Sequence, residues 1–354
     1  MIRALLGAVA AAGLLLAGGP AAAQSKLFST QAPLQLTLTA PLPALVRSAK
    51  TRLDPFPATL TVAEAGAAPA TIPLEVRPRG ISRRIAGFCT FPPLQLRFSD
   101  KAALKGTVFK GQSHLKLVTY CQDHDDYEQR IMLEYLAYRL YATVTPLSYR
   151  VRPAQVTYRT TGKADDKGVT RFGYLIEDID DLADSNGMKV LKLTSHQITA
   201  QQFDQKAAAR AAMFEFMVSN LDWDFLAAAQ GQECCHNSRF VAVSNAPPLR
   251  NVIPLIYDFD FSGFVDAPYA GPPVGIPVQS TRDRYYRGYC ASSGEVPGVI
   301  AEFKAHRAEM MALIDGQSGL EPKMKAKASR YLDSFFTLVD DPGKVQAQII
   351  KHCR

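Results

Sequence analysis

The apolar residues of this 354-residue chain change their spacing about halfway along it. In the first half they alternate with polar residues over short stretches, as in 34–39 (LQLTLT) and 114–120 (HLKLVTY). Alternation with a period of two predicts β-strands. In the second half they recur at helical spacing, as in 201–219 and 323–339, which predicts α-helices. The acidic segment 177–181 lies between the two patterns.

This order of patterns predicts an α+β protein with a two-lobed fold, β-rich in residues 24–180 and mainly helical in residues 181–354. One helix, at about 125–142, interrupts the strands, and the aspartates at its start favour the positive end of the helix dipole. Because two lobes of different composition leave a cleft between them, we expect a small-molecule site at their junction.

The first 23 residues have the pattern of a secretory signal peptide. Arg3 supplies the positive start, residues 5–17 form an apolar run, and Ala21 to Ala23 before Gln24 resemble a cleavage site. The apolar run is short for a transmembrane helix, and no later stretch is apolar enough to span a membrane. We therefore expect an exported protein, periplasmic or secreted, without a membrane span after cleavage.

The charges of the chain are scattered, with a net charge of +7. A scattered positive excess suits an anionic partner such as a nucleotide or a phosphate group. No basic segment is interleaved with aromatic residues, so the sequence argues against a nucleic-acid partner.

The cysteines of an exported chain are candidates for disulfides. There are six, and six cysteines allow fifteen pairings; they are Cys89, Cys121, Cys234, Cys235, Cys290 and Cys353. Cys89 and Cys121 both lie at the edges of strand-like segments, so we expect them to join one sheet.

The neighbours Cys234 and Cys235 are expected not to pair with each other. Each would instead reach a different partner, and Cys290 and Cys353 would then serve this adjacent pair. Zinc bound by the two neighbours and His236 is the alternative, although the paired cysteine spacing typical of structural zinc sites is absent.

The segment 253–264 (IPLIYDFDFSGF) is the most informative part of the chain for chemistry. An apolar strand runs into Asp258 and Asp260, and alternation places both carboxylates on one strand face, about 7 Å apart. Mg²⁺ prefers one or two carboxylates together with phosphate oxygens, so a metal–nucleotide site suits this pair. An acidic turn with backbone hydrogen bonds is the alternative. The phosphate-binding GxxxxGK[ST] loop and the GxGxxG, GxSxG and HExxH patterns are absent.

A second acidic segment, 216–225 (FMVSNLDWDF), follows an apolar helix and contains Asp222 and Asp224. Asn237 comes shortly before the next apolar strand. An aspartate, then an asparagine, then an acidic strand end is the order of residues in kinase catalysis. Alternatively, Asn220 and Asp222 end the helix and cap a turn.

Glu134 lies in an otherwise apolar helix, so its carboxylate needs a cation or strong hydrogen bonds. Lys116, in the preceding strand, is the first candidate, because kinases pair a strand lysine with a helix glutamate. A bridge from Glu134 to Arg139 or to Arg150 is the alternative.

Four arginines cluster in 77–84 (RPRGISRR) around Gly80 and Ser82. Guanidinium groups match phosphate oxygens, and a glycine lets the backbone approach them closely. Arg79 and Arg83 are therefore candidate phosphate ligands. A solvated basic loop is the alternative reading of the segment.

Taken in order, these segments resemble the CotH family of secreted and spore-coat protein kinases, and more distantly HipA-like kinases. The resemblance is carried by RGISR (79–83), GYLIEDID (173–180), DWD (222–224), Asn237 and, above all, YDFDFSG (257–263). It implies a two-lobed protein-kinase-like fold. It also implies that ATP with Mg²⁺ or Mn²⁺ binds in the cleft and that the phosphoryl group is transferred to a protein Ser/Thr or a related hydroxyl.

The resemblance also implies roles for single residues. The catalytic carboxylate is Asp222, with Asp224 as its alternative. The nucleotide-binding residues it implies are Lys116, Glu134 and Glu177, beside the candidate phosphate ligands Arg79 and Arg83 of the arginine-rich segment. The expected metal ligands and their support are Asn237, Asp258 and Asp260. Two other classes of function remain open at this stage: a non-catalytic envelope or surface protein with a degenerate kinase-like scaffold, and a Ca²⁺ or carbohydrate site in the acidic cluster.

Overall fold

The computed structural model describes residues 26–63, 68–85, 87–229 and 232–354. The expected signal peptide, residues 1–23, lies outside the described residues. Within them, no helix is both long enough and apolar enough to cross a membrane.

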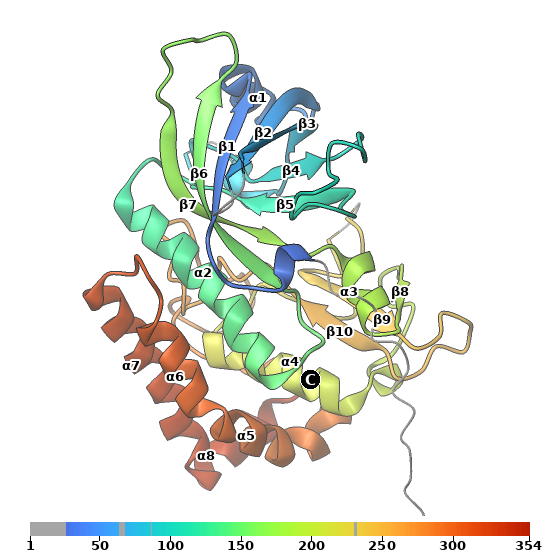
Figure 1. Ribbon diagram of the computed structural model, residues 1–354. Coiled ribbons are helices and arrows are strands. Elements are labelled where there is room, and N and C mark those ends of the chain that lie inside the picture. Colours follow the sequence, from blue (N-terminus) through green and yellow to red (C-terminus); the bar gives the residue numbers. More distant parts are fainter. Residues whose placement is uncertain (1–25, 64–67, 86, 230–231) are drawn as a thin grey trace, which may run out of the picture.

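Seven strands of the first half form a closed barrel (Figure 1). They are β1 (Leu34–Ala40), β2 (Phe56–Ala63), β3 (Ala70–Pro78), β4 (Leu94–Arg97), β5 (His114–Val118), β6 (Val151–Thr160) and β7 (Val169–Ile176). Their order around the barrel is β1-β2-β3-β4-β5-β7-β6, and β1 closes it by pairing in parallel with β6. All other neighbours are antiparallel.

This closed mixed barrel contradicts the expected two-lobed protein-kinase-like fold. The half of the chain that is rich in strands does precede the mainly helical half, but its seven strands close into one barrel. Strand alternation is a local pattern, whereas closure depends on a parallel pair in which Leu34 lies opposite Ala154. A parallel pairing between distant segments leaves no mark in the spacing of apolar residues, so the sequence pattern did not reveal it.

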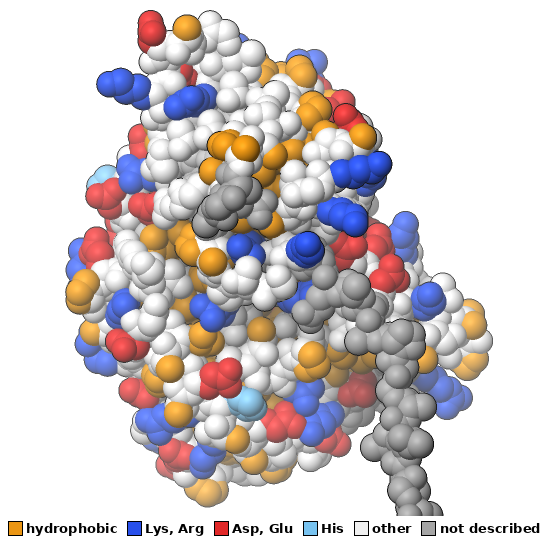
Figure 2. All heavy atoms as spheres, in the orientation of Figure 1, with side chains coloured by type: hydrophobic (Ala, Val, Ile, Leu, Met, Phe, Trp, Pro, Cys, Tyr) orange, Lys and Arg blue, Asp and Glu red, His pale blue; other side chains and the backbone are white. Residues whose placement is uncertain are grey.

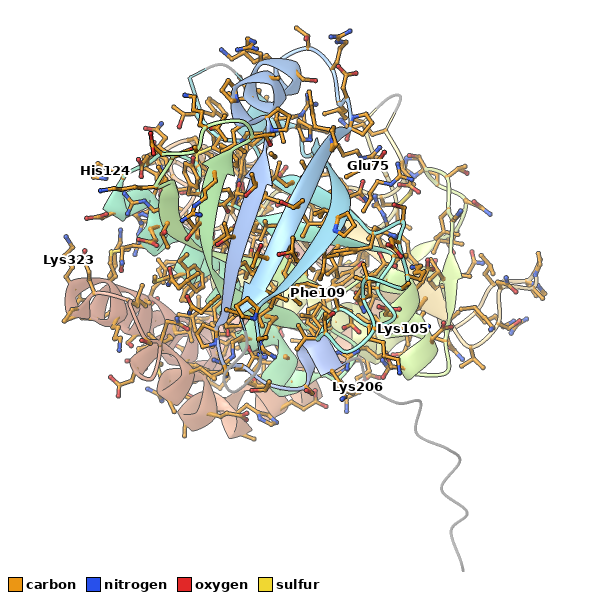
Figure 3. All side chains as sticks on the ribbon, turned by 45° about the horizontal axis from the view of Figure 1, so that its top comes forward. Glu75, Lys105, Phe109, His124, Lys206 and Lys323 are labelled. Carbon is orange, nitrogen blue, oxygen red and sulfur yellow. A yellow bond between two sulfur atoms is a disulfide. The ribbon has the colours of Figure 1, made fainter. Side chains whose placement is uncertain are left out.

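The barrel interior is a packed apolar core. Alternate residues of β1 are buried and the intervening ones are more exposed, as the period of two predicts. The segment between β4 and β5 adds Phe109 to this core, whereas Lys105 of the same segment lies at the surface (Figure 3). A short helix, α1 (Leu42–Ala49), follows β1 and packs on β3 and β6.

The second half is mainly helical and has its own apolar core. Its helices are α3 (Ile179–Ser185), α4 (Gln205–Val218), α5 (Val296–Ala305), α6 (Arg307–Asp315), α7 (Pro322–Val339) and α8 (Pro342–Gln348). A three-stranded antiparallel sheet, in the order β10-β9-β8, consists of β8 (Lys189–Leu191), β9 (Ser238–Ala242) and β10 (Ile253–Ile256).

The helix α2 (Asp125–Val144) connects the two halves. It contacts β7 of the barrel and α6 of the helical half, and Figure 1 shows it running between them. Its first turn carries Asp125, Asp126 and Glu128, and the His124 side chain caps it by accepting from the Asp126 N–H at 3.2 Å. Most of its length is buried, so a single helix carries side chains from the barrel into the helical core.

The disulfides agree with the sequence prediction in part. Cys89 is bonded to Cys121, which confirms the predicted link between the strand-like segments. Cys290 is bonded to Cys353, so these two do not serve the adjacent pair as expected. The structure instead joins Cys234 to Cys235, so the expectation that the neighbours avoid each other was wrong. The physical reason is long-range, because the fold brings residues 290 and 353 together and leaves the neighbours no other partner.

Acidic and basic side chains are interspersed over the face of the molecule in Figure 2, without a large area of one sign. This agrees with the scattered charges of the sequence. Concave sites with low-dielectric walls concentrate electrostatic fields, so they can differ from such a mixed surface.

Candidate functional site

One pocket gathers most of the predicted site residues. It has a volume of about 320 Å³ and lies where the loop after β3, the helix α2 and the segments before β9 and after β10 meet. The predicted residues that line it are Arg79, Arg83, Glu134, Asp222, Asn237, Asp258 and Asp260. Lys116, Glu177 and Asp224 do not line it. We call it the main pocket.

A buried ion network forms one wall of the main pocket. The Arg83 guanidinium pairs with the Glu134 carboxylate and, through Nε, with Asp260 Oδ2 at 3.0 Å. The three side chains are almost completely buried. The Tyr269 hydroxyl also donates to Asp260 Oδ2, at 3.0 Å. Burial raises the pKa of Glu134, and Arg83 acts against this rise.

The partner of Glu134 is therefore Arg83, and neither Lys116 nor the alternatives Arg139 and Arg150 take that place. Arg150 pairs instead with Glu177, with its Nε 2.9 Å from Glu177 Oε2. Sequence reasoning missed the Arg83 pair because it treated the arginine loop and the helix as separate features. The buried charge of Glu134 was the available signal, since it requires a cation from somewhere in the fold.

Lys116 lies half-buried between two aromatic rings near the main pocket. Its Nζ is 4.8 Å from the ring centroid of Tyr257, which lines the pocket, and 5.8 Å from that of Tyr149. Burial lowers the pKa of Lys116 to about 7, and repulsion by Arg79 and Arg239 acts in the same direction. The surroundings of Lys116 thus disfavour the protonated amine, and an anionic ligand would stabilise that protonated form.

Asp258 is the carboxylate with the fewest protein partners in the main pocket. Its backbone is left-handed (φ +69°), and its N–H donates to the Tyr138 hydroxyl at 2.9 Å. No donor to its carboxylate is found among the described residues. Burial raises its pKa to about 7, and the nearby carboxylates of Asp260 and Glu134 add to the rise. An additional cation at this place would relieve that repulsion.

The strand alternation used to place Asp258 and Asp260 does not apply to them. β10 ends at Ile256, so both residues lie in the turn that follows it. They still line one pocket, yet their surroundings differ: Asp260 is bound by Arg83, whereas Asp258 is not paired with any described residue.

Asp222 is held in a defined orientation at the other side of the main pocket. Its Oδ1 is 2.7 Å from His236 Nε2, and its Oδ2 accepts from Asn237 Nδ2 at 3.1 Å. The hydrogen bond to Asp222 raises the pKa of His236. The Asp222 side chain is about one-third exposed, which leaves it accessible from the pocket.

His236 is a site residue whose place sequence reasoning missed. It was considered only as a zinc ligand beside Cys234 and Cys235, whereas those two are bonded to each other and the ring faces Asp222. Its position directly before Asn237 was the available signal, because neighbours of a predicted site residue often orient the same group.

Asp224, the alternative catalytic carboxylate, faces away from the main pocket. Its Oδ2 accepts from Arg354 Nη1 at 2.8 Å, and its Oδ1 accepts from the Tyr289 hydroxyl at 3.1 Å and from the Leu226 N–H at 2.8 Å. These partners occupy both carboxylate oxygens. Of the two aspartates of this loop, only Asp222 is thus placed to meet a ligand in the main pocket.

A smaller pocket of about 290 Å³ adjoins the main pocket and shares Asp222 and Phe261 with it. Its other walls are Ser219, Leu221, Thr281 and the proline- and glycine-rich residues 271–274. Asp222 is therefore accessible from two sides.

Neither a family model nor a curated protein matches this chain. Among the described residues, no group of three or more His, Cys, Asp or Glu side chains is arranged to hold a metal ion.

Proposed function

We propose that this chain is a phosphotransferase that binds ATP with Mg²⁺ or Mn²⁺ in the main pocket and transfers the terminal phosphoryl group to a hydroxyl of a protein or a related acceptor. One observation carries the proposal: the same pocket contains an oriented carboxylate, Asp222, and an unpaired one, Asp258, with cations nearby. The likeness of short segments to CotH-type kinases supports the choice of reaction, although the kinase fold expected with it is set aside.

The cations near the pocket suit a chain of phosphates. Arg79 and Arg239 line it, and Lys116 lies close enough for both to affect its pKa. Arg239 pairs with the exposed Glu233 at 3.1 Å, and no ion pair of Arg79 is found within the described part of the chain. Arginine and lysine bind phosphate oxygens by charge-assisted hydrogen bonds, so a triphosphate would stabilise Lys116 together with the two arginines that repel its charge.

The acidic residues suit the metal that accompanies such a nucleotide. The Asp258 carboxylate and Asn237 Oδ1 both lack a donor among the described residues, while Asp260 is bound to Arg83. Mg²⁺ is usually held by one or two carboxylates together with phosphates and water, so a cluster of three acidic residues is not required. When bound, the ion would neutralise phosphate charge, and Asp258 and Asn237 would be its ligands from this chain.

Asp222 is the candidate base. The hydroxyl oxygen of the acceptor forms a bond to the terminal phosphorus, the bond from that phosphorus to the ADP oxygen breaks, and the hydroxyl proton passes to Asp222. The hydrogen bonds from His236 and Asn237 fix the direction of the carboxylate, which is what this role requires. The smaller pocket on the other side of Asp222 gives the acceptor a place.

Two variants separate binding from transfer. With Asp258→Ala we expect the metal-dependent rise in melting temperature with ATP to disappear, because a ligand that binds only the folded state raises that temperature. With Asp222→Asn we expect ATP binding to stay within about twofold and phosphoryl transfer to fall about 10²–10⁴-fold, the range for loss of a general base. Transfer is measured as ADP release and phosphate incorporation into a mixture of candidate acceptors.

Asp165→Asn is the control. Because Asp165 is exposed in the β6–β7 hairpin, this variant should change neither ATP binding nor phosphoryl transfer. A flat thermal response of the parent to ATP, ADP and AMP, with either metal and with EDTA, contradicts the proposal. That result would favour a role in binding or assembly without catalysis.

A further inference from the structure

The loop that carries Asp222, residues 221–227, is held from the side away from the main pocket. Arg287 Nη1 donates to the carbonyl oxygens of Leu221 and Trp223, the latter at 2.7 Å. These carbonyls flank Asp222 on both sides along the chain. One guanidinium group thus fixes the backbone on which the candidate base is mounted.

A second arginine holds the next part of the loop. Arg354 donates from Nη1 to Asp224 Oδ2 at 2.8 Å and from Nη2 to the Tyr289 hydroxyl at 3.0 Å. Its Nε donates to the carbonyl of Arg287 at 2.9 Å, so the two arginines are linked to each other. The side chains of Arg287 and Asp224 are mostly buried and that of Arg354 is partly exposed, which favours strong charge-assisted bonds.

The disulfide Cys290–Cys353 places Arg354 at this position. The residue after Cys353 is Arg354, whose N–H donates to the Gly288 carbonyl at 3.0 Å and whose carbonyl accepts from the Cys290 N–H at 3.0 Å. These bonds join the final residues of the sequence to the segment that contains Arg287. Without the disulfide, two backbone hydrogen bonds and the side-chain contacts of Arg354 remain to hold it there.

The single tryptophan of the chain lies at the centre of this arrangement. The guanidinium carbons of Arg287 and Arg354 are each 5.4 Å from the ring centroid of Trp223. The ring is 2% exposed, and its Nε1 donates to the Asn220 carbonyl at 3.0 Å. Movement of either arginine therefore changes the surroundings of the only indole in the molecule.

We propose that Arg287 and Arg354 are positioning residues for Asp222, and that the Cys290–Cys353 disulfide keeps Arg354 in place for this task. The part concerning transfer rests on the proposed function. Loss of the disulfide leaves Arg354 held by hydrogen bonds alone, so Arg354 and the loop at Asp224 move more, and Asp222 is oriented less precisely toward the acceptor. ATP binding is retained, because Arg79, Lys116 and Asp258 come from other segments.

The first experiment compares two disulfides of the same protein. Cys290→Ser/Cys353→Ser is expected to shift Trp223 emission to longer wavelength and to increase its quenching by acrylamide severalfold. Transfer is expected to fall about 10- to 100-fold, the usual effect of a misplaced catalytic group, with KM for ATP within about twofold. Cys89→Ser/Cys121→Ser, which removes the link at the barrel, is the control and should leave Trp223 emission unchanged.

The second experiment leaves both disulfides intact. Arg354→Gln is expected to reproduce the emission shift and the fall in kcat. Arg354→Lys is expected to show smaller changes in both, since lysine retains the positive charge opposite Asp224. Unchanged Trp223 emission and unchanged transfer in Arg354→Gln and in the Cys290/Cys353 variant would overturn the inference. If the parent transfers no phosphate but Trp223 responds as expected, the proposed function fails and the positioning of the loop stands.

Discussion

The interior of the barrel is an apolar core, whereas the main pocket contains buried charged side chains. The barrel interior consists of buried apolar side chains, such as the fully buried Leu38 and Leu60. The main pocket instead contains the buried charges of Arg83, Glu134 and Asp260, with left-handed backbone at Asn237 and Asp258. Positive φ at a residue other than glycine and buried like charges both cost free energy.

The difference teaches where stability and chemistry are located. Features that cost free energy persist only where the surrounding structure holds them, and they are commonly concentrated at functional sites. Those of the main pocket lie where two apolar cores meet, the barrel and the helical half, with α2 contacting both. We therefore expect substitutions in the barrel to lower the unfolding free energy alone. Substitutions in the main pocket should change the unfolding free energy and ligand binding separately.

The largest expected effect is that of Arg83→Ala. This change leaves two buried carboxylates, Glu134 and Asp260, without their cation, and breaking a buried ion pair in this way costs about 3–5 kcal/mol of unfolding free energy. Urea denaturation at pH 7.5 measures the loss. Arg79→Ala is the matched control, because Arg79 lines the same pocket and should change stability by less than about 0.5 kcal/mol. Equal losses of unfolding free energy in the two variants would show that the buried ion network does not distinguish the main pocket from the barrel.

A change in the barrel should be costly without touching the pocket. Leu60 is fully buried, so Leu60→Ala should lower the unfolding free energy by about 3 kcal/mol, within the range for such cavities. ATP affinity, measured by calorimetry at a temperature where the variant is folded, should stay within about twofold. Thr59→Ala, at the exposed neighbouring position, should be nearly neutral. A loss of ATP affinity with Leu60→Ala would show that the two regions are coupled.

The same contrast explains what the sequence could reveal. The alternation in residues 34–39 and 114–118 identified barrel strands, because each strand buries one face. Helical spacing likewise identified α4 and α7. Local patterns carry this information in full, so these elements were predictable.

The joining of distant segments was not predictable in this way. The parallel pair β1–β6 closes the barrel, and the Arg83–Glu134 pair joins residues 51 positions apart. Both depend on how the whole chain is folded. Residues singled out for their chemistry nevertheless come together, since Arg83, Glu134, Asp222, Asn237, Asp258 and Asp260 line one pocket. Carboxylates and arginines in apolar surroundings need hydrogen-bonding or charged partners, and apolar packing does not provide them.

Asp258→Asn should stabilise the protein while impairing the site. The pKa of Asp258 is raised to about 7 in the folded state, above its ordinary value. The folded state is therefore penalised as pH rises from about 4 through 7, and the penalty is complete above that range. Asparagine carries no charge and tolerates left-handed backbone, so we expect a gain of about 1–2 kcal/mol at pH 8 and almost none at pH 4.

Urea midpoints of the parent and of Asp258→Asn at the two pH values measure this difference. Asp165→Asn is again the control, with no dependence on pH expected from its exposed position. A destabilised Asp258→Asn at pH 8 would mean that the carboxylate has a stabilising partner in the protein, and the reading of Asp258 as an unpaired ligand would be wrong.

Lys116→Met should give the smallest effect, with the opposite dependence on pH. The pKa of Lys116 is lowered to about 7 in the folded state, so the folded state is penalised as pH falls from about 10 through 7. Because the side chain is half-buried, solvent screening reduces the gain from removing the charge to about 1 kcal/mol at pH 6, and it should vanish near pH 10. Lys105→Met, at an exposed position, should show no such dependence. An equal gain in unfolding free energy at both pH values would mean that the gain comes from packing of the methionine between Tyr149 and Tyr257. The charge of Lys116 would then have no part in it.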